Sequence, residues 1–338
     1  MNLYVREIVS PLEVFEYKKC IKKINSIKNR FIKKCFNNLL KMIINFKYNC
    51  FYMTGKIIER KEENYEICLI PFKKNSSNKI INKWIKNIKY ISTSKSIKKI
   101  IISEKLKVVD LINKNFICSN EIEGKYLLKF MIKDVINYVI DKKNEEIERQ
   151  EIYILVNEYS KFNLQLIEQL AHSVKNVNIV TNNLKKFLVF VNKIYEKSGI
   201  MITVSNNKRK SLKKAILIIN VDFLEKNLEK YNINRTAIII NLTKEKINSI
   251  KGFSGLIING MQIQKIKKNQ IIYEKEFDFF DNTVFYESLI YDSYDFHIAN
   301  EKIKNDAIKI EFLIGQNGAI NMNEYGKIAW QMRKIELI

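Results

Sequence analysis

Glycine and proline are scarce in this chain, with 9 and 2 occurrences among 338 residues. Few turns can therefore rely on left-handed backbone, and few segments have the composition of a flexible linker. No apolar run approaches the roughly 20 residues that span a bilayer. The first 20 residues carry charges where a secretory signal has its apolar core. These absences predict a cytoplasmic protein without a membrane partner.

Residues that bind metals or act as nucleophiles are also few. Two histidines, His172 and His297, lie far apart in the sequence. Five cysteines all precede residue 119, and none forms a C-x-x-C pair. We therefore predict no metal site, and we expect reduced, mostly buried thiols. The sequence contains no P-loop, G-x-S-x-G or H-E-x-x-H motif.

Positive charge, in contrast, is abundant. The chain has 59 Lys and Arg against 36 Asp and Glu, which gives a formal net charge of +23. Nearly all of these basic residues are lysines, whereas proteins that read bases favour the planar fork of arginine. Two interpretations stay open: attraction to nucleic acid or another polyanion, and drift toward the Lys, Asn and Ile codons of an AT-rich genome. The even spread of lysine favours drift.

The first 120 residues are expected to form an α/β domain. Residues 12–46 place apolar side chains at helical spacing, with lysines on the other face, and predict one or two amphipathic helices. A basic helix of this kind can lie on a membrane, but we expect its apolar stripe to pack on its own domain. A hairpin is predicted at 50–58 and 65–72, followed by further helices and strands up to residue 120.

Residues 151–264 dominate the organisation of the chain. Short runs rich in Val and Ile alternate with helical segments, and they predict strands at 152–157, 177–181, 200–205, 215–222, 237–242 and 256–259. Parallel strands joined by right-handed helical crossovers form a doubly wound sheet of the α/β class. We predict a linking helix and boundary at 121–150, and a small C-terminal α+β extension at 265–338 that packs back on the other domains.

Ligands of a doubly wound sheet bind beyond the carboxyl ends of its strands. Basic, hydroxyl and amide side chains gather at three of these predicted ends, where helix N-termini also favour phosphate. They are the candidate site for a small-molecule or nucleotide ligand, and they comprise Ser160, Lys161, Asn182, Asn183, Lys185, Asn206, Lys208, Arg209 and Ser211.

The order of elements over residues 120–265 resembles the NAD(P)-binding domain of the shikimate dehydrogenase and glutamyl-tRNA reductase superfamily. The stretch Val180-Thr181-Asn182-Asn183-Leu184 is similar to the Asn-Arg-Thr that contacts the 2′-phosphate of NADP in that family. Residues 252–262 are similar to its late glycine-containing segment. The resemblance implies a Rossmann-like fold that follows a substrate domain, with NADP as the cofactor if any is bound.

The loop after the first strand departs from that family pattern. Glycines in G-x-G-x-x-G let backbone N–H groups approach a pyrophosphate, but residues 157–162 read Asn-Glu-Tyr-Ser-Lys-Phe. Tyr159 and Phe162 would crowd a pyrophosphate, and Glu158 would repel it. We therefore predict a degenerate Rossmann-like domain that acts as a non-catalytic binding, scaffold or regulatory module. An atypical NADP-dependent oxidoreductase and a polyanion binder remain alternatives, and the oligomeric state is left open.

Overall fold

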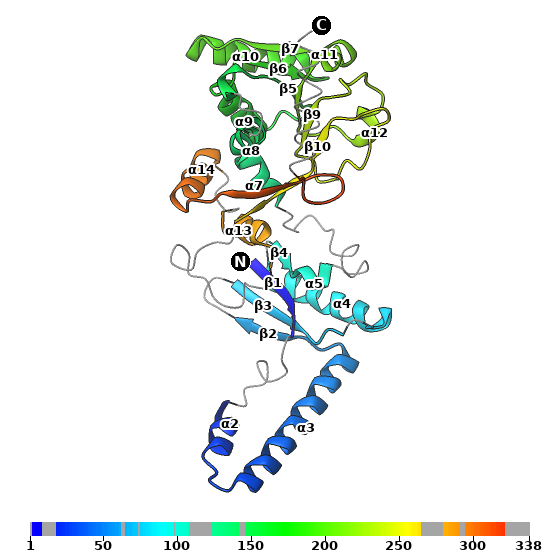
Figure 1. Ribbon diagram of the computed structural model, residues 1–338, viewed down its shortest axis with the longest axis vertical. Coiled ribbons are helices and arrows are strands. Elements are labelled where there is room, and N and C mark those ends of the chain that lie inside the picture. Colours follow the sequence, from blue (N-terminus) through cyan, green and yellow to red (C-terminus); the bar gives the residue numbers. More distant parts are fainter. Residues whose placement is uncertain are drawn as a thin grey trace. The chain divides into compact units, whose positions relative to one another are not determined.

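The computed structural model describes residues 2–8, 18–61, 65–73, 75–97, 99–107, 124–141, 146–264, 280–290 and 295–321. The chain divides into two compact units (Figure 1): unit 1 comprises residues 1–122 and 274–288, and unit 2 comprises residues 123–273 and 289–338. Among the described residues, no helix combines the length and the apolar character needed to cross a bilayer.

A four-stranded sheet of order β2-β3-β1-β4 forms the centre of unit 1. Its strands are β1 (Asn2–Glu7), β2 (Ile58–Lys61), β3 (Tyr65–Ile70) and β4 (Lys99–Ile102). β1 pairs in parallel with β3 and β4, whereas β2 and β3 form the predicted hairpin. The hairpin begins later than predicted, because Cys50–Thr54 continue a helix. The α/β class predicted for this region is confirmed.

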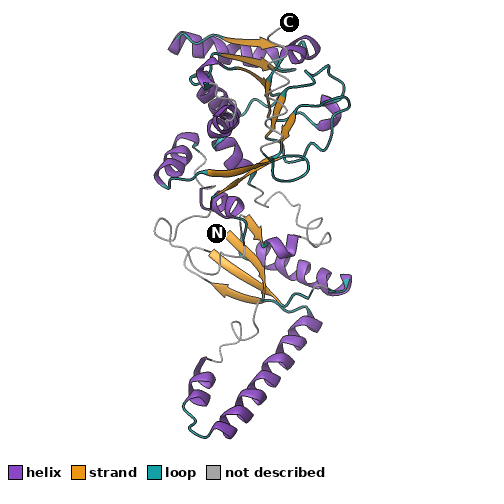
Figure 2. Ribbon diagram, viewed as in Figure 1, coloured by secondary structure: helices purple, strands orange, loops and turns teal. Residues whose placement is uncertain are grey.

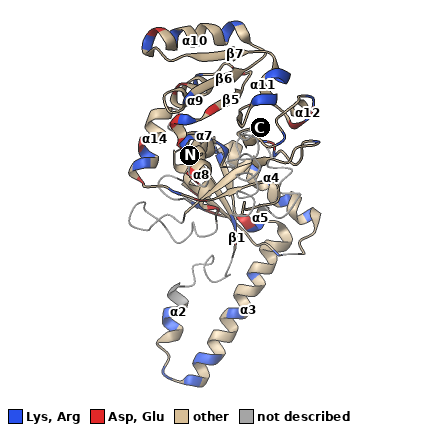
Figure 3. Ribbon diagram, turned by 45° about the horizontal axis from the view of Figure 1, so that its top comes forward, with Lys and Arg blue, Asp and Glu red and all other residues tan. Residues whose placement is uncertain are grey.

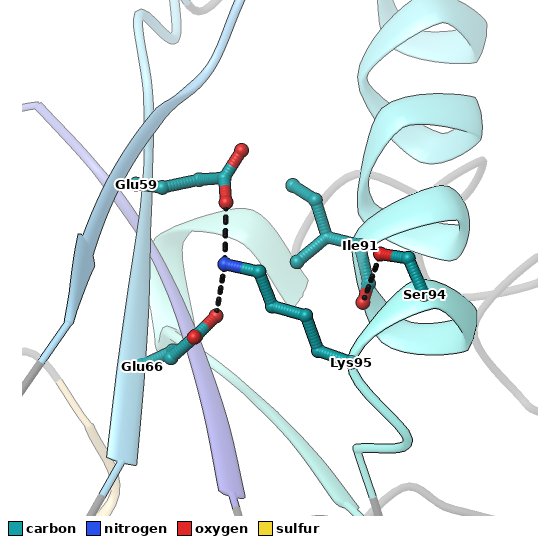
Figure 4. Close-up of polar contacts among 5 residues, drawn as sticks. All are labelled: Glu59, Glu66, Ile91, Ser94 and Lys95. Atoms are coloured by element: carbon teal, nitrogen blue, oxygen red, sulfur yellow. Dashed lines mark hydrogen bonds and ion pairs between the residues drawn. The ribbon is translucent and has the colours of Figure 1, made fainter.

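Helix α4 (Asn78–Ser94) supplies the core of unit 1 with a continuous apolar stripe. Its buried residues recur at helical spacing and pack against the sheet and the short helix α5 (Glu104–Lys107); they are Ile81, Trp84, Ile85, Ile88 and Ile91. Beyond its end, Lys95 Nζ lies 2.7 Å from Glu59 Oε2 and 2.8 Å from Glu66 Oε2 (Figure 4). Hydrogen bonds to Glu59 and then Glu66 raise the pKa of Lys95. The lysine thus joins β2 and β3 to the end of α4.

Two further helices precede β2. They are α2 (Lys18–Asn25) and α3 (Arg30–Thr54). Asn29 caps α3, since its Oδ1 accepts hydrogen bonds from the N–H groups of Phe31 (3.0 Å) and Ile32 (3.2 Å). Gly55 ends the helix with φ of 70°, a left-handed conformation that glycine adopts without strain. The predicted helices are therefore present, but large apolar side chains of α3 are exposed, whereas we expected them to pack on their own domain.

Unit 2 is built on a six-stranded sheet of order β10-β9-β8-β5-β6-β7, in which every pairing is parallel. Figure 2 shows strands and helices together in this unit. The strands are β5 (Glu151–Leu155), β6 (Asn176–Val180), β7 (Ile202–Ser205), β8 (Leu217–Asn220), β9 (Ile238–Asn241) and β10 (Leu256–Ile258). Counted along the chain from β5, the spatial order is 6-5-4-1-2-3, which is the Rossmann order. The predicted Rossmann-like sheet is confirmed.

Helices connect these strands and complete unit 2. The crossovers contain α9 (Lys161–Ala171), α10 (Leu184–Ser198), α11 (Lys208–Lys214) and α12 (Glu225–Leu228). The predicted linking helix is divided at Met131 into α7 (Lys125–Phe130) and α8 (Ile132–Asp141), and a 3-10 turn η1 (Ile147–Arg149) leads into β5.

A small α+β region of the predicted class follows the sheet, but its first strand lies before residue 265, where we expected the region to begin. β11 (Gly260–Ile263) pairs antiparallel with β12 (Ile310–Ile314), and α14 (Phe296–Asn305) precedes β12. The helix α13 (Asn282–Ile290) contains a boundary between the two units in the sequence, which falls between Ser288 and Leu289. The helix predicted at 324–338 lies outside the described residues.

Candidate functional site at the carboxyl edge of the six-stranded sheet

An internal carboxylate holds the loop that follows β5. Asp222, two residues after β8, accepts hydrogen bonds from the N–H of Asn157 (2.9 Å to Oδ1 and 2.8 Å to Oδ2) and from the N–H of Glu158 (2.6 Å to Oδ2). The two loops meet because β5 and β8 are neighbours at the point where the strand order reverses. In a dinucleotide-binding domain, N–H groups of this loop face the pyrophosphate. Here they face a side chain of the same chain.

The protonation of Asp222 reflects this environment. Burial raises the pKa of Asp222 above its ordinary value, and the charge of Glu158 raises it further. The hydrogen bonds from the two N–H groups and the charge of Lys129 lower the pKa, but they do not cancel the effect of burial. Burial thus disfavours the charged form of Asp222, and the hydrogen bonds from the two N–H groups offset this loss of hydration in part.

The aromatic side chains of the β5–α9 loop pack on helices of unit 2. The Tyr159 ring meets the buried Phe187 of α10 edge-on, with ring centroids 5.5 Å apart. The Phe162 ring lies 5.3 Å from each of the rings of Phe130 and Phe296. No residue from 157 to 162 has a positive φ, so the loop follows a path that does not require glycine. The aromatic residues that would crowd a pyrophosphate have a packing role instead.

The predicted site residues at the ends of β6 and β7 join the same hydrogen-bond network. The N–H of Asn182 donates to Asn157 Oδ1 (2.8 Å), and Nδ2 of Asn183 donates to the Asn157 carbonyl (2.5 Å). Lys208 Nζ donates to Asn182 Oδ1 and, at 3.4 Å, to the carbonyl of Asn206. The network therefore runs from Asp222 through Asn157 to the start of α11. Partial burial lowers the pKa of Lys208.

The remaining predicted site residues are placed less centrally. Ser160 caps α9, because its Oγ accepts the N–H of Asn163 at 3.3 Å, and Lys161 begins that helix with an exposed side chain. Ser211 Oγ lies 3.4 Å from Ser205 Oγ. Lys185 and Arg209 are exposed in the first turns of α10 and α11. The structure thus brings Asn182, Asn183, Asn206 and Lys208 together and leaves Lys161, Lys185 and Arg209 in solvent.

Sequence reasoning missed a ladder of asparagines at the other half of the edge. Asn220 Nδ2 donates to Asn241 Oδ1 (3.1 Å), and Asn241 Nδ2 donates to Asn259 Oδ1 (3.0 Å). All three are buried, at 0%, 0% and 3% exposure. Asn220 also bonds both backbone groups of Phe223, and Asn259 bonds both backbone groups of Ile247. The signal was the tripeptide Ile-Ile-Asn at 218–220, 239–241 and 257–259, although the same tripeptide also occurs in α3 and α4, at 43–45 and 80–82.

Unit 2 also contains a polar pocket of about 570 Å³ that both histidines line. Its walls come from α8, α9 and α14, together with Lys197 at the end of α10. The side-chain oxygens of Gln165 and Gln169 are buried and have no hydrogen-bond partner in the described part of the chain. Lys197 and Glu168 form an ion pair at 3.2 Å. Within the described ranges, no three His, Cys, Asp or Glu side chains lie close enough to hold a metal ion.

No protein-family model and no curated protein matches the sequence. Among solved structures, the chain is similar to shikimate dehydrogenase in complex with NADP+, at 11% identity and a TM-score of 0.32 over 98% of this chain and 95% of that one. It is similar to L-tryptophan dehydrogenase from Nostoc punctiforme at 8% identity and a TM-score of 0.29, over 90% and 77% of the two chains.

A third similar structure is Thermococcus litoralis Δ1-pyrroline-2-carboxylate reductase in complex with NADH and L-proline, at 14% identity and a TM-score of 0.24. The match covers 34% of this chain and 36% of that one, so the chain spans about a third of the reductase's length. Scores this low carry no conclusion about activity. The Rossmann-like assignment rests on the strand order of the sheet.

Proposed function

We propose that this chain is a non-catalytic Rossmann-like module, with a binding, scaffold or regulatory role, whose phosphate-binding loop is closed by its own carboxylate. The observation that carries the proposal is the set of hydrogen bonds from the N–H groups of Asn157 and Glu158 to Asp222. A pyrophosphate at this loop would have to displace that carboxylate. It would also need the two N–H donors that the carboxylate now uses.

Electrostatics support this proposal. Asp222 and Glu158 both carry negative charge beside the loop, where a pyrophosphate would add more of the same sign. Two like unit charges 4 Å apart repel by about 4 kcal/mol at the effective dielectric constant of a protein surface. Such a penalty weakens binding about a thousandfold. Lys161 at the start of α9 and Lys129, whose charge acts on Asp222, offset part of this repulsion, but the carboxylate of Asp222 still occupies the N–H groups of Asn157 and Glu158.

We place the ligand site of this module beside the loop rather than on it. Lys185, Lys208 and Arg209 follow the ends of β6 and β7, and their charges suit a carboxylate or phosphate group of a small molecule. Asn182 and Asn206 supply amide groups for orientation. Cys68 is buried, as expected, but the expected burial is wrong for Cys35 and Cys50, which are exposed. Free, exposed thiols suit the reducing cytoplasm, where we expect the protein to act.

Calorimetric titration of the full chain with NADPH and NADH tests the proposal. The wild-type protein is expected to show no saturable binding at micromolar concentrations of either dinucleotide. Asp222→Ala removes the blocking carboxylate, and any dinucleotide binding that this loop can support is expected in that variant alone. Saturable micromolar binding by the wild-type protein would refute the proposal and favour the atypical NADP-dependent oxidoreductase.

Glu225→Ala is the matched control for this titration. Glu225 Oε1 accepts the N–H groups of Asn248 (3.1 Å) and Ser249 (2.9 Å), so the variant also removes a carboxylate that holds two backbone donors of a loop. It is expected to bind no more dinucleotide than the wild-type protein. Equal gains in both variants would show that general loss of negative charge, and not the opening of the β5–α9 loop, permits binding.

A further inference from the structure

The outward face of α3 exposes large apolar side chains along its whole length. Phe31, Met42 and Phe46 are 76%, 70% and 72% exposed, and Ile44 is the one buried residue that the structure assigns to this helix. The exposed apolar residues, which we call the α3 apolar face, are Phe31, Ile32, Phe36, Leu39, Met42, Ile43, Phe46 and Met53. The prediction that this stripe packs on its own domain is therefore wrong for these residues.

The opposite side of α3 already packs on unit 1. The ring of Tyr52 lies 5.9 Å from the Trp84 ring of α4, and the hydroxyl of Tyr48 donates to the Phe72 carbonyl at 3.2 Å. At 100° per residue, Ile44, Tyr48 and Tyr52 fall on one side of the helix, and the α3 apolar face covers an arc of about 140° on the other. A helix of 25 residues is about 38 Å long. The face is thus a long strip that the sheet of unit 1 does not cover.

The helices α2 and α3, which we call the α2–α3 hairpin, carry charge of one sign. Residues 18–54, which span α2 and α3, contain no Asp or Glu, and Figure 3 shows blue without red on α3. Their basic residues are Lys18, Lys19, Lys22, Lys23, Lys28, Arg30, Lys33, Lys34, Lys41 and Lys47. Within α3 itself, the lysines lie outside the arc of the apolar face. Lys47 and then Lys33 follow one edge of the apolar face, whereas Lys34 and Lys41 lie on the side of Ile44, Tyr48 and Tyr52. An apolar strip on a helix whose charges are all positive is complementary to a surface that is apolar inside and negative at its rim.

We propose that α3 docks on the surface of an anionic lipid bilayer. The apolar face would enter the boundary between headgroups and acyl chains, and the lysines would meet the lipid phosphates. A second copy of the chain is a poorer occupant, because two such hairpins would bring their positive charges together. Nucleic acid is also poorer, because it attracts the lysines but leaves the large apolar side chains in water.

Sedimentation of the full chain with lipid vesicles tests this proposal. The wild-type protein is expected to bind vesicles of phosphatidylcholine containing about one third phosphatidylglycerol, and to bind pure phosphatidylcholine far less. The triple variant Phe31→Ser/Phe36→Ser/Phe46→Ser is expected to lose binding to the anionic vesicles by at least about tenfold. All three positions are exposed, so its circular dichroism and unfolding midpoint are expected to match the wild type.

The matched control is Leu188→Ser/Val189→Ser/Met201→Ser, which removes three exposed apolar side chains from unit 2. It is expected to bind anionic vesicles as the wild-type protein does. A second variant, Lys33→Gln/Lys34→Gln/Lys41→Gln, is expected to weaken binding severalfold at low salt and to reduce its salt dependence.

Three results would overturn the proposal. The first is equal binding of the anionic vesicles by the wild type and the Phe triple variant. The second is a dimer in light scattering that the Phe triple variant alone abolishes, with no vesicle binding by the wild type, since a second copy would then cover the face. The third is retention of duplex DNA by the wild type and the Phe triple variant alike, with no vesicle binding.

Discussion

The two halves of the carboxyl edge of the Rossmann-like sheet use polar side chains in different ways. At β8, β9 and β10, three asparagines bond one another in the interior. At β5, β6 and β7, the polar groups are Asn157, Asn182 and Lys208, joined by Asp222 from the loop after β8, and each of them is partly or fully exposed. The polar groups of the first half are bonded to one another and excluded from water, whereas those of the second half remain accessible to water.

The largest expected effect comes from breaking the buried half. Asn241→Ala removes the acceptor of one Asn220 Nδ2–H and the Nδ2 donor that serves both Asn259 Oδ1 and the Glu245 carbonyl. Asn220 keeps its bonds to Phe223 and Asn259 keeps its bonds to Ile247, but the ladder between them is broken in the interior. We expect the free energy of unfolding to fall by about 3 kcal/mol, measured by urea denaturation. Asn206→Ala, at the exposed end of β7, is the control and is expected to cost less than about 0.5 kcal/mol. Equal losses would remove the distinction between the halves.

A smaller effect is expected from Asp222→Ala. The N–H groups of Asn157 and Glu158 lose their acceptor, but Asn157 and Glu158 are not buried and water can replace the carboxylate. We expect a loss of about 1 kcal/mol and faster hydrogen exchange of these two amides. Unchanged exchange at both positions would show that the carboxylate does not hold the loop in solution.

The pH dependence of stability distinguishes Asp222 from the uncharged ladder. Its pKa is raised in the folded state, so between the ordinary value of 3.8 and the raised value the folded protein keeps a proton that the unfolded chain releases. The wild type therefore gains stability relative to Asp222→Asn as pH falls through this window, and it loses that gain as pH rises. Urea unfolding of both proteins at stepwise pH measures the difference. A pH-independent difference would contradict the raised pKa.

The smallest effect is expected from Lys208→Gln. Lys208 Nζ bonds Asn182 Oδ1 and the Asn206 carbonyl at a partly exposed position, and glutamine can still donate there. We expect a change in unfolding free energy within about 0.5 kcal/mol, by urea denaturation. A loss as large as that of Asn241→Ala would mean that the exposed half is as cooperative as the buried one.

The sequence was sufficient for the sheet but not for its edge. Val- and Ile-rich runs alternating with helical segments predict the six strands, and the rule for right-handed crossovers restricts their order. The same runs end in asparagine, but periodicity does not reveal that Asn220, Asn241 and Asn259 bond one another. Asp222 and Asn157 are 65 residues apart in the sequence, so their contact follows from the strand order and not from any local pattern.

The helices of unit 1 show the same limit. α3 and α4 both have amphipathic patterns, and both are helices in the structure. α4 buries its stripe against the sheet, whereas α3 exposes its apolar face. Hydrophobic periodicity predicts which side chains share a face, but it does not predict what covers that face. The absence of acidic residues from residues 18–54 was visible in the sequence. It supports the proposed docking of α3 on an anionic surface.

The chemical shifts of the Asn157 and Glu158 amides, followed while NADPH is added, test the closed loop most directly. We expect both amide signals to respond to pH through the titration of Asp222 and to stay unchanged at millimolar NADPH. Replacing Asp222 by Ala is expected to abolish their response to pH. A saturable shift of both amides with NADPH in the wild-type protein would show that a dinucleotide displaces the carboxylate, and would contradict the account.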